Sequence, residues 1–140
     1  MNSKDIISRP LVSIGPERTV LEAARKMAEN NVGLLVVCDP DNWLRGVVSE
    51  RDIIRAVAAG KDFATKVATV STATVATVGW GSEVAEAAKV MNKHKIRHVV
   101  VVDDASKPIG VISMRDLVGE RSTLRTILQS HDRDVFPGGD

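Results

Sequence analysis

Apolar residues in this chain follow a helical spacing in one stretch and a strand-like run in the next, and this order occurs twice. The spacing i, i+3, i+4, i+7 is occupied by Val20, Ala23, Ala24 and Met27 and again by Val84, Ala87, Ala88 and Met91. It predicts an amphipathic helix with one buried face. Each helix is followed by a β-branched run, at 34–38 and at 98–102, that is typical of a strand buried on both faces.

The other predicted elements complete a β-α-β-β-α order in each copy. Further strands are predicted at 11–14 and 75–78 before the helices, and at 45–48 and 108–112 after turns at 39–42 and 103–106. Thr19 and Glu22 form a capping-box pattern at the start of the first helix. A closing helix is predicted at 52–59, because Gly60 is suited to the C′ position that ends a helix.

The two copies are related by an offset of 64 residues without a gap. When residues 12–54 are placed on 76–118, 14 of the 43 positions are identical. The paired endings 46–52 and 110–116 share Gly, Ser, Arg and Asp at the same spacing. Core packing explains repeated Val and Ala, but it does not explain a repeated polar set. The repeat therefore suggests a cleft with two related half-sites.

One repeat of about 50 residues is too small to bury both faces of its strands. The sequence therefore predicts an α+β fold in which two pseudo-twofold β-α-β-β-α repeats pack sheet to sheet, with the helices outside. The expected divisions are 4–60 for the first repeat, 61–118 for the linker and second repeat, and 119–140 for a helical tail with a disordered end.

Composition narrows the function. A net charge of +1 argues against general electrostatic binding of nucleic acid or membrane. Only 3% of the residues are aromatic, so few side chains are available for nucleic-acid bases to stack on. Cys38 is the single cysteine, so no intramolecular disulfide or cysteine-based metal site is expected, and its place in an apolar run predicts an inert buried thiol. No signal segment or run of ~20 apolar residues is visible, so a soluble, cytoplasmic protein is expected.

The repeated endings resemble those of a known family. The chain is similar to a tandem pair of CBS domains, the cystathionine-β-synthase-type repeats that form a Bateman module. The resemblance covers 4–118 and rests on the repeated Gly-apolar-apolar-Ser-x-x-Asp ending. It also rests on the strings Ser49–Ile54 and Ile96–Asp103, which are common in bacterial and archaeal members. With no catalytic or transport domain attached, the resemblance implies a stand-alone CBS pair.

The resemblance implies a regulatory module that binds an adenosine nucleotide between the repeats, with AMP first and ADP or ATP also expected. Such a ligand is regulatory, and no obligatory cofactor is implied. The residues carried over are Val12, Val47, Ser49, Arg51, Asp52, Ala76, Arg97, His98, Val111, Ser113, Arg115 and Asp116. An ionised carboxylate can accept a hydrogen bond from each of two ribose hydroxyls, and a serine can donate to a phosphate or ribose oxygen. The apolar residues of the set resemble the walls of an adenine slot.

Simpler interpretations stay open. Each Asp begins a helix, where it stabilises the N-terminus, and each Ser suits an N-cap. Arg97 and His98 start a strand and can face solvent, although the family often places basic residues here against phosphates; His94 and His131 are expected at the surface. A structural or partner-binding CBS module without a physiological nucleotide is the alternative function. No catalytic residues and no metal ligands are expected, because no nucleophile elbow, Gly-rich phosphate loop or metal spacing is present.

Two further expectations concern asymmetry and assembly. The site built on Val47, Ser49 and Asp52 is expected to receive Arg97, His98 and Arg115 at its phosphate end, whereas that built on Val111, Ser113 and Asp116 faces Gly33, Leu34 and Arg51. The first should bind nucleotide more tightly, and more so when His98, with a reference pKa of about 6.5, is protonated. A homodimer is expected through the outer helices, with Ala56, Val57, Ala59, Leu117 and Val118 contributing.

Overall fold

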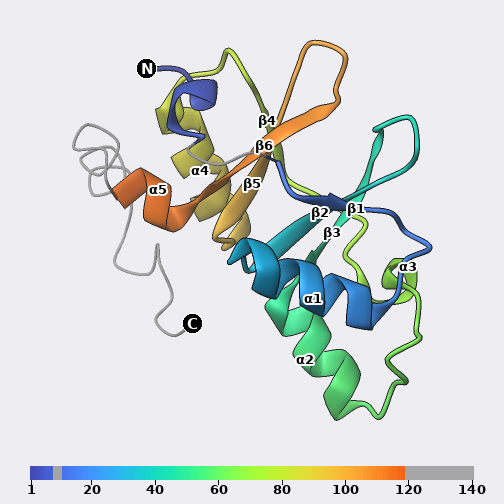
Figure 1. The fold of residues 1–140 in the computed structure, drawn as a ribbon. Coiled ribbons are helices and arrows are strands. Elements are labelled where there is room, and N and C mark those ends of the chain that lie inside the picture. Colours follow the sequence, from blue (N-terminus) through green and yellow to red (C-terminus); the bar gives the residue numbers. More distant parts are fainter. Residues whose placement is uncertain (8–10, 119–140) are drawn as a thin grey trace. The chain divides into compact units, whose positions relative to one another are not determined.

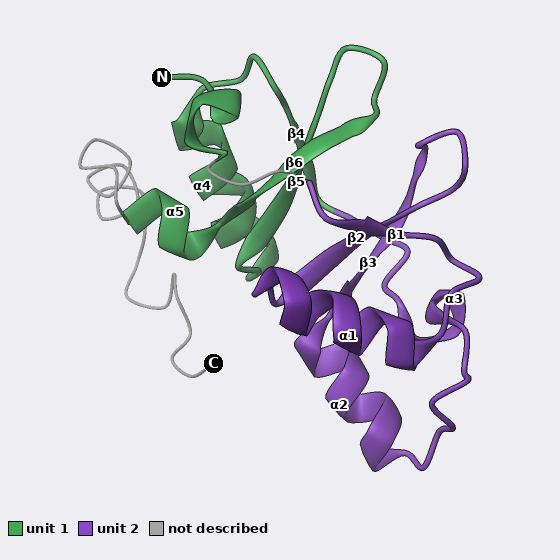
Figure 2. Cartoon of the chain, viewed as in Figure 1, with its two compact units in different colours: residues 1–10, 76–140 green, residues 11–75 purple. Residues whose placement is uncertain are grey.

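The computed structural model describes residues 1–7 and 11–118 and divides into two compact units. Unit 1 comprises residues 1–10 and 76–140, and unit 2 comprises residues 11–75 (Figure 2). Each unit is described by itself. The tail expected at 119–140 lies outside the described residues.

Unit 2 contains the first repeat. Its elements are β1 (Ser13–Ile14), α1 (Val20–Asn30), β2 (Leu34–Cys38), β3 (Leu44–Ser49), α2 (Glu50–Ala58) and α3 (Val67–Val70), as Figure 1 shows. The sheet order is β1-β2-β3, with β1 parallel and β3 antiparallel to the central β2.

Unit 1 contains the second repeat and has the same topology. Its elements are the 3-10 helix η1 (Ser3–Ile6), β4 (Thr77–Gly79), α4 (Val84–His94), β5 (His98–Val102), β6 (Pro108–Ser113) and α5 (Met114–Val118). Its sheet order is β4-β5-β6, again parallel and then antiparallel. The predicted α+β class and the repeated β-α-β-β-α order are confirmed; the packing of one sheet on the other stays a prediction.

Most core residues are those that the sequence pattern placed inside; the exceptions are Val67 of the linker and Leu117, which was expected on the dimer surface. In unit 2 the core contains Ile14, Ala23, Met27, Leu35, Val37, Val48 and Val67. In unit 1 it contains Val78, Val84, Ala87, Ala88, Met91, Val99, Val101, Ile112 and Leu117. Both predicted helical stripes therefore pack on their sheets, with Ala24 only half-buried. The Cys38 thiol is buried as expected, and burial, followed by the Asp39 carboxylate, raises its pKa.

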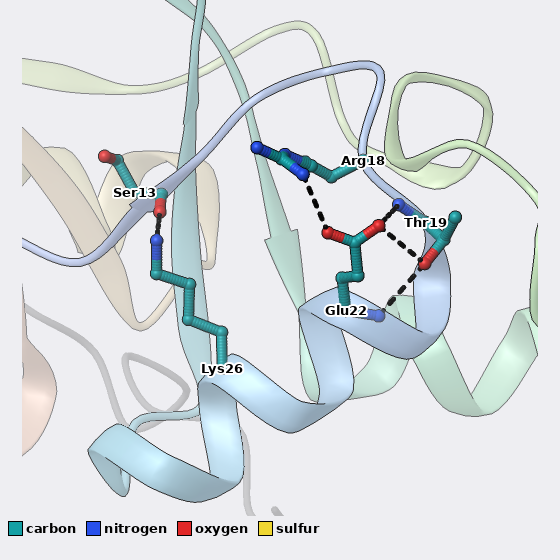
Figure 3. Close-up of polar contacts among 5 residues, drawn as sticks. All are labelled: Ser13, Arg18, Thr19, Glu22 and Lys26. Atoms are coloured by element: carbon teal, nitrogen blue, oxygen red, sulfur yellow. Dashed lines mark hydrogen bonds and ion pairs between the residues drawn. The ribbon is translucent and has the colours of Figure 1, made fainter.

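Helix α1 begins with the capping box that the sequence predicted. The amide of Glu22 donates to the Thr19 hydroxyl at 3.1 Å, and the Glu22 carboxylate accepts from the Thr19 amide and from Arg18 (Figure 3). One further contact ties the helix to the sheet, because the Lys26 ammonium donates to the carbonyl of Ser13 in β1. β1 is an edge strand, so the Lys26 ammonium supplies a hydrogen-bond donor for a carbonyl that has no partner strand on that side.

Each repeat is preceded in the sequence by a short helix, but that helix belongs to the unit that contains the other repeat. α3 precedes the second repeat in sequence, yet Val67 is buried in the core of unit 2. η1 precedes the first repeat, yet Ser3 is buried in unit 1 and its hydroxyl lies 2.9 Å from that of Ser82. The sequence repeats and the compact units are therefore different divisions of the chain. Neither short helix was predicted.

The predicted end of the closing helix is confirmed, whereas part of the predicted dimer surface is wrong. The left-handed Gly60 ends α2, with the Lys61 amide donating to the Ala56 carbonyl as in a Schellman motif. The dimer surface needs correction, because Ala56 and Leu117 are 3% and 0% exposed and pack inside their own units. Their neighbours Val57, Ala59 and Val118 are exposed.

In the part of the chain that the structure describes, no helix is both long and apolar enough to cross a bilayer.

Candidate functional site

The first repeated polar set forms one corner of unit 2, where β3 ends and α2 begins. Ser49 is the N-cap of α2, and its hydroxyl accepts from the Asp52 amide at 3.2 Å. In return, the Asp52 Oδ2 accepts from the Ser49 amide at 2.8 Å. This reciprocal pair satisfies two amides at the helix start, so Asp52 has a structural task even without a ligand. The helix begins at Glu50, two residues earlier than predicted.

The capping box leaves hydrogen-bonding capacity unused. The Ser49 hydroxyl accepts within the box, so its proton remains available to donate. Among the described residues, the Asp52 Oδ1 accepts no hydrogen bond, and its Oδ2 retains a second acceptor site. One carboxylate held in place by a backbone amide can thus still accept from two vicinal hydroxyls. Capping and ribose contact are compatible roles for this residue.

The second polar set repeats this geometry in unit 1. Asp116 Oδ2 accepts from the Ser113 amide at 2.8 Å, and the Asp116 amide donates to the Ser113 hydroxyl at 3.2 Å. The two distances equal those of the first corner. The sequence therefore repeats the local structure as well as the residue types. The N-cap interpretation of Ser49 and Ser113 is confirmed, and ligand contact by these residues stays a prediction.

The structure explains why Gly46 and Gly110 precede these polar sets. A Cβ on Gly46 would lie 2.6 Å from the carbonyl oxygen of Thr72, because the linker pairs with Val47 through hydrogen bonds of 3.0 and 2.9 Å. At Gly110 the added Cβ would lie 2.7 Å from the Ile7 side chain. The space beside each glycine is filled by the chain's own segments, so neither glycine leaves its strand open to a ligand on that side.

The expected adenine-slot residues lie at equivalent places in the two units. The carbonyls of Val12 and Ala76 accept from the amides of Val36 and Val100, each at 3.1 Å. Val12, Val47, Ala76 and Val111 are all half-buried. Within unit 2, Val12 directly precedes β1 and Val47 lies on β3, the two neighbours of β2. Within unit 1, Ala76 directly precedes β4 and Val111 lies on β6, the two neighbours of β5. Their predicted contact with adenine is untested.

Three of the predicted basic residues, Arg97, His98 and Arg115, belong to unit 1. His98 is paired with Ser113 across the β5–β6 ladder, and the Arg97 carbonyl accepts from the Met114 amide at 2.7 Å. Arg115 is exposed on the first turn of α5, as Arg51 is on α2. Arg97, His98, Ser113 and Asp116 are thus neighbours within one unit. His94 is exposed, as expected, whereas His131 lies outside the described residues.

The corner of unit 2 differs from that of unit 1 at positions 33 and 50. Gly33 stands where the other repeat has Arg97, and Glu50 stands where it has Met114. The Glu50 amide donates to the Gly33 carbonyl at 3.0 Å, and a Cβ on Gly33 would lie 3.3 Å from the Glu50 carboxylate. Glu50 aligns with Met114, so it does not appear among the residues that are identical in the two repeats. A comparison of the positions at which the repeats differ would have identified it.

Neither corner resembles a metal site. Across residues 1–7 and 11–118, no group of three or more His, Cys, Asp or Glu side chains is placed to hold a metal ion. What the corners offer is a paired hydroxyl and carboxylate, exposed basic groups and half-buried aliphatic residues. This donor set suits a ligand with vicinal hydroxyls, an apolar planar part and an anionic group.

Among solved structures, the chain is similar to a CBS domain protein from Pyrobaculum aerophilum complexed with AMP. The two are 37% identical, the match covers 93% of this chain and all of that one, and the TM-score is 0.86. A CBS domain pair in complex with 5′-methylthioadenosine and S-adenosyl-L-methionine is 27% identical, with coverages of 85% and 94% and a TM-score of 0.78. Adenosine ligands therefore occur in structures of closely similar architecture.

Curated relatives give the same picture. A CBS domain-containing protein of Bacillus subtilis is 30% identical over 81% of both chains. An uncharacterized 17.7 kDa protein of Acidianus ambivalens is 36% identical over 74% of this chain, and the matched region spans 63% of that relative. An uncharacterized protein of Methanopyrus kandleri is 33% identical over 81% of this chain and 59% of its own length. The chain thus spans less than two thirds of these two relatives.

The family model for the CBS domain matches twice, at residues 4–59 and 67–122. Each match includes one of the two polar corners. The chain belongs to the CBS domain family, of which it contains a tandem pair.

Proposed function

We propose that this CBS pair is a regulatory module that binds an adenosine nucleotide, with AMP as the preferred ligand, and has no catalytic activity of its own. The observation that carries the proposal is the repetition of a capped Ser-x-x-Asp corner with spare hydroxyl and carboxylate capacity in both units. The similar Pyrobaculum aerophilum protein, complexed with AMP, supports the choice of ligand.

The proposed site takes its ribose-binding carboxylate from one repeat and its phosphate contacts largely from the other. Asp52 and Ser49 would hold the ribose of one ligand, with Val47 and Ala76 beside the adenine and Arg97, His98 and Arg115 toward the phosphate. Asp116 and Ser113 would hold the ribose of a second ligand, with Val111 and Val12 beside the adenine and Arg51 toward the phosphate. Well-made charge-assisted phosphate contacts are worth about 1.5–3 kcal/mol each, so the Asp52 site should be the tighter by at least about tenfold.

Isothermal titration with AMP, ADP, ATP and S-adenosylmethionine tests the proposal, together with thermal unfolding in the presence of each ligand. A ligand at a hundredfold excess over its Kd raises the free energy of unfolding by about 2.7 kcal/mol. Heat of binding with AMP and a matching rise in Tm are expected. If none of these ligands gives heat or a Tm shift at millimolar concentration, the proposal is wrong.

One observation favours a second function. The capping boxes already give the Ser-x-x-Asp residues a structural role, so their presence does not require a ligand. A structural or partner-binding CBS module would retain them for stability alone. Substitution separates the two functions: in a nucleotide sensor, a change at Asp52 lowers both Tm and AMP affinity, whereas in a purely structural module it lowers Tm and no AMP binding exists to be lost.

A further inference from the structure

The C-terminal end of α4 carries a group of exposed basic side chains within unit 1. Its members, which form the basic cluster, are Lys89, Lys93, His94 and Lys95. Among the residues that the structure describes, none of these four side chains forms an ion pair. No Asp or Glu occurs between residues 87 and 102, so the chain supplies no nearby carboxylate in sequence. The positive charge of the cluster is therefore directed to solvent.

The same helix end in the other repeat is built without this charge. α1 has the length of α4, and its four equivalent residues are Arg25, Glu29, Asn30 and Asn31. A cation in the last turn stabilises a helix through its macrodipole, but the last turn of α1 has no basic residue. The fold of the repeat therefore does not require the basic cluster.

Lys95 has a backbone conformation that suits asparagine better than lysine. It is the left-handed C-cap of α4, with a φ of 56°, and Asn31 is the left-handed C-cap of α1, with a φ of 54°. Residues with a short polar side chain adopt this conformation far more readily than other non-glycine residues. A lysine at position 95 thus adds a surface charge at some cost in local stability. This cost is a second indication that the charge serves something other than the fold.

The surroundings of the basic cluster favour a short acidic peptide segment over other polyanions. None of the exposed large hydrophobic residues of the described chain lies in 84–98, so the cluster lacks the apolar anchor of a membrane-binding helix. The same range has no aromatic residue on which a base could stack. Glu83 and Glu86, at the opposite end of α4, would repel a polyanion that extended along the helix. Lys89 and Lys95 are separated by about 9 Å of helix rise, which suits a few carboxylates.

We infer that the basic cluster of α4 is a docking surface for a short acidic segment of another protein. Complementary charge speeds the encounter of two proteins and selects against partners of the wrong sign. Each exposed ion pair is worth little by itself, so several together give a weak and reversible contact that salt screens. The docking surface lies within unit 1 and exists whether or not the chain binds a nucleotide.

The test is a titration of the intact chain into a fluorescein-labelled octaglutamate peptide, followed by fluorescence anisotropy at low and high salt. Lys93→Glu with His94→Asn and Lys95→Asn copies the end of α1 onto α4, and α1 shows that these residues form the same helix end. This triple variant should bind the peptide about tenfold more weakly at low salt, and high salt should remove the difference.

The matched control is Arg25→Gln with Arg55→Gln and Lys61→Gln. It changes the net charge by the same amount, with His neutral, at three exposed positions of unit 2 and should leave peptide binding nearly unchanged. Thermal unfolding of both variants shows whether a loss of binding is a loss of folding.

A single variant keeps the test decisive if the triple variant unfolds. Lys95→Asn alone places the better residue in the left-handed position, so it should raise Tm slightly while weakening the peptide about two- to threefold at low salt. The docking surface is refuted if octaglutamate does not bind at low salt, or if the control variant loses as much affinity as the triple variant. A short DNA duplex or phosphatidylserine vesicles that bind the basic cluster more tightly than the peptide would also overturn it, in favour of nucleic acid or membrane.

Discussion

At the scale of single residues, the same atoms serve stability and the proposed binding. Ser49 and Asp52 use one lone pair and one carboxylate oxygen to cap α2, and what remains is what a ribose or phosphate needs. A structural role is therefore no argument against a ligand. The two roles separate only when a comparable capping box without a proposed ligand is altered in parallel, and α1 provides one in Thr19 and Glu22.

Asp52→Ala is expected to lower the free energy of unfolding by about 1 kcal/mol through the lost cap, and to abolish the tighter AMP site. Asp116→Ala should have a similar effect on stability but spare that site. The matched control is Glu22→Ala, which removes the same N3 carboxylate from a capping box on α1 and should lower Tm without changing AMP binding. Titration and thermal unfolding measure both effects. Loss of the tighter site in Asp116→Ala, but not in Asp52→Ala, would reverse the assignment.

Asp39 stabilises the turn between β2 and β3. Its carboxylate accepts from the amides of Trp43 and Asp41 and from Arg45, at 2.9, 3.0 and 2.7 Å respectively. The amide of Trp43 first, and then Arg45, hold the pKa of Asp39 below its usual value. A lowered pKa in the folded state contributes stability above the unfolded pKa, and this is lost as pH falls through the folded value. Asp39→Asn should therefore be less stable than the unaltered chain at pH 7.

Thermal unfolding between pH 7 and pH 3 checks this prediction. The difference in Tm between Asp39→Asn and the unaltered chain should shrink as the solution becomes acidic. Asp41→Asn, which changes an exposed neighbour in the same turn, should show no such convergence. A Tm difference that grows toward acid would contradict the role given to Asp39.

At the scale of elements, the sequence predicted the helices and strands whose positions are determined by a local pattern of side chains. The bounds of β2 and β5 were correct to the residue, because a run of β-branched side chains ended by a turn leaves little choice. The short helix α3 was missed, since residues 61–74 show no amphipathic stripe; the helix is held by tertiary contacts, with Val67 and Val70 packed on the core of unit 2 and hydrogen bonds from the Val67 and Ala68 amides to Arg18 and Pro16. Glu50 was missed for a different reason: it is a departure from the repeat.

The linker is expected to be an integral part of unit 2. Gly46→Ala would place a methyl group 2.6 Å from the Thr72 carbonyl, and backbone cannot move aside as a flexible side chain can. The expected cost is about 1–3 kcal/mol of unfolding free energy, because the β3–linker pairing at Val47 must shift. Chemical denaturation measures this cost.

Two other glycines serve as controls for that experiment. Gly110→Ala meets the Ile7 side chain rather than backbone, so its cost should be smaller. Gly79→Ala meets nothing within 4 Å and should be nearly neutral. An equal loss for all three variants would show that the Gly46 contact with the linker is not the cause.

At the scale of the whole molecule, the chain is built as two units whose boundaries do not follow the repeats. Residues 1–7 complete unit 1: the Lys4 ammonium lies 4.3 Å from the Trp80 ring centroid, and the Ser3 amide donates to the Ser82 carbonyl at 2.7 Å. The linker completes unit 2. Each repeat thus depends on a segment that the sequence places next to the other repeat, so the two repeats should unfold cooperatively.

The last prediction concerns assembly. Ile54 and Val57 are 66% and 51% exposed on one face of α2, and Val118 at 52% occupies the position in α5 that is equivalent to Ile54. Exposed apolar side chains at matching positions of both repeats favour burial against a second copy of the chain. We therefore expect a homodimer at tens of micromolar protein by light scattering. Ile54→Asp should lower the mass toward that of a monomer, whereas Ala105→Asp, in the exposed β5–β6 turn, should not. A monomeric mass for the unaltered chain would refute the dimer, and a dimeric mass for Ile54→Asp would place its interface elsewhere.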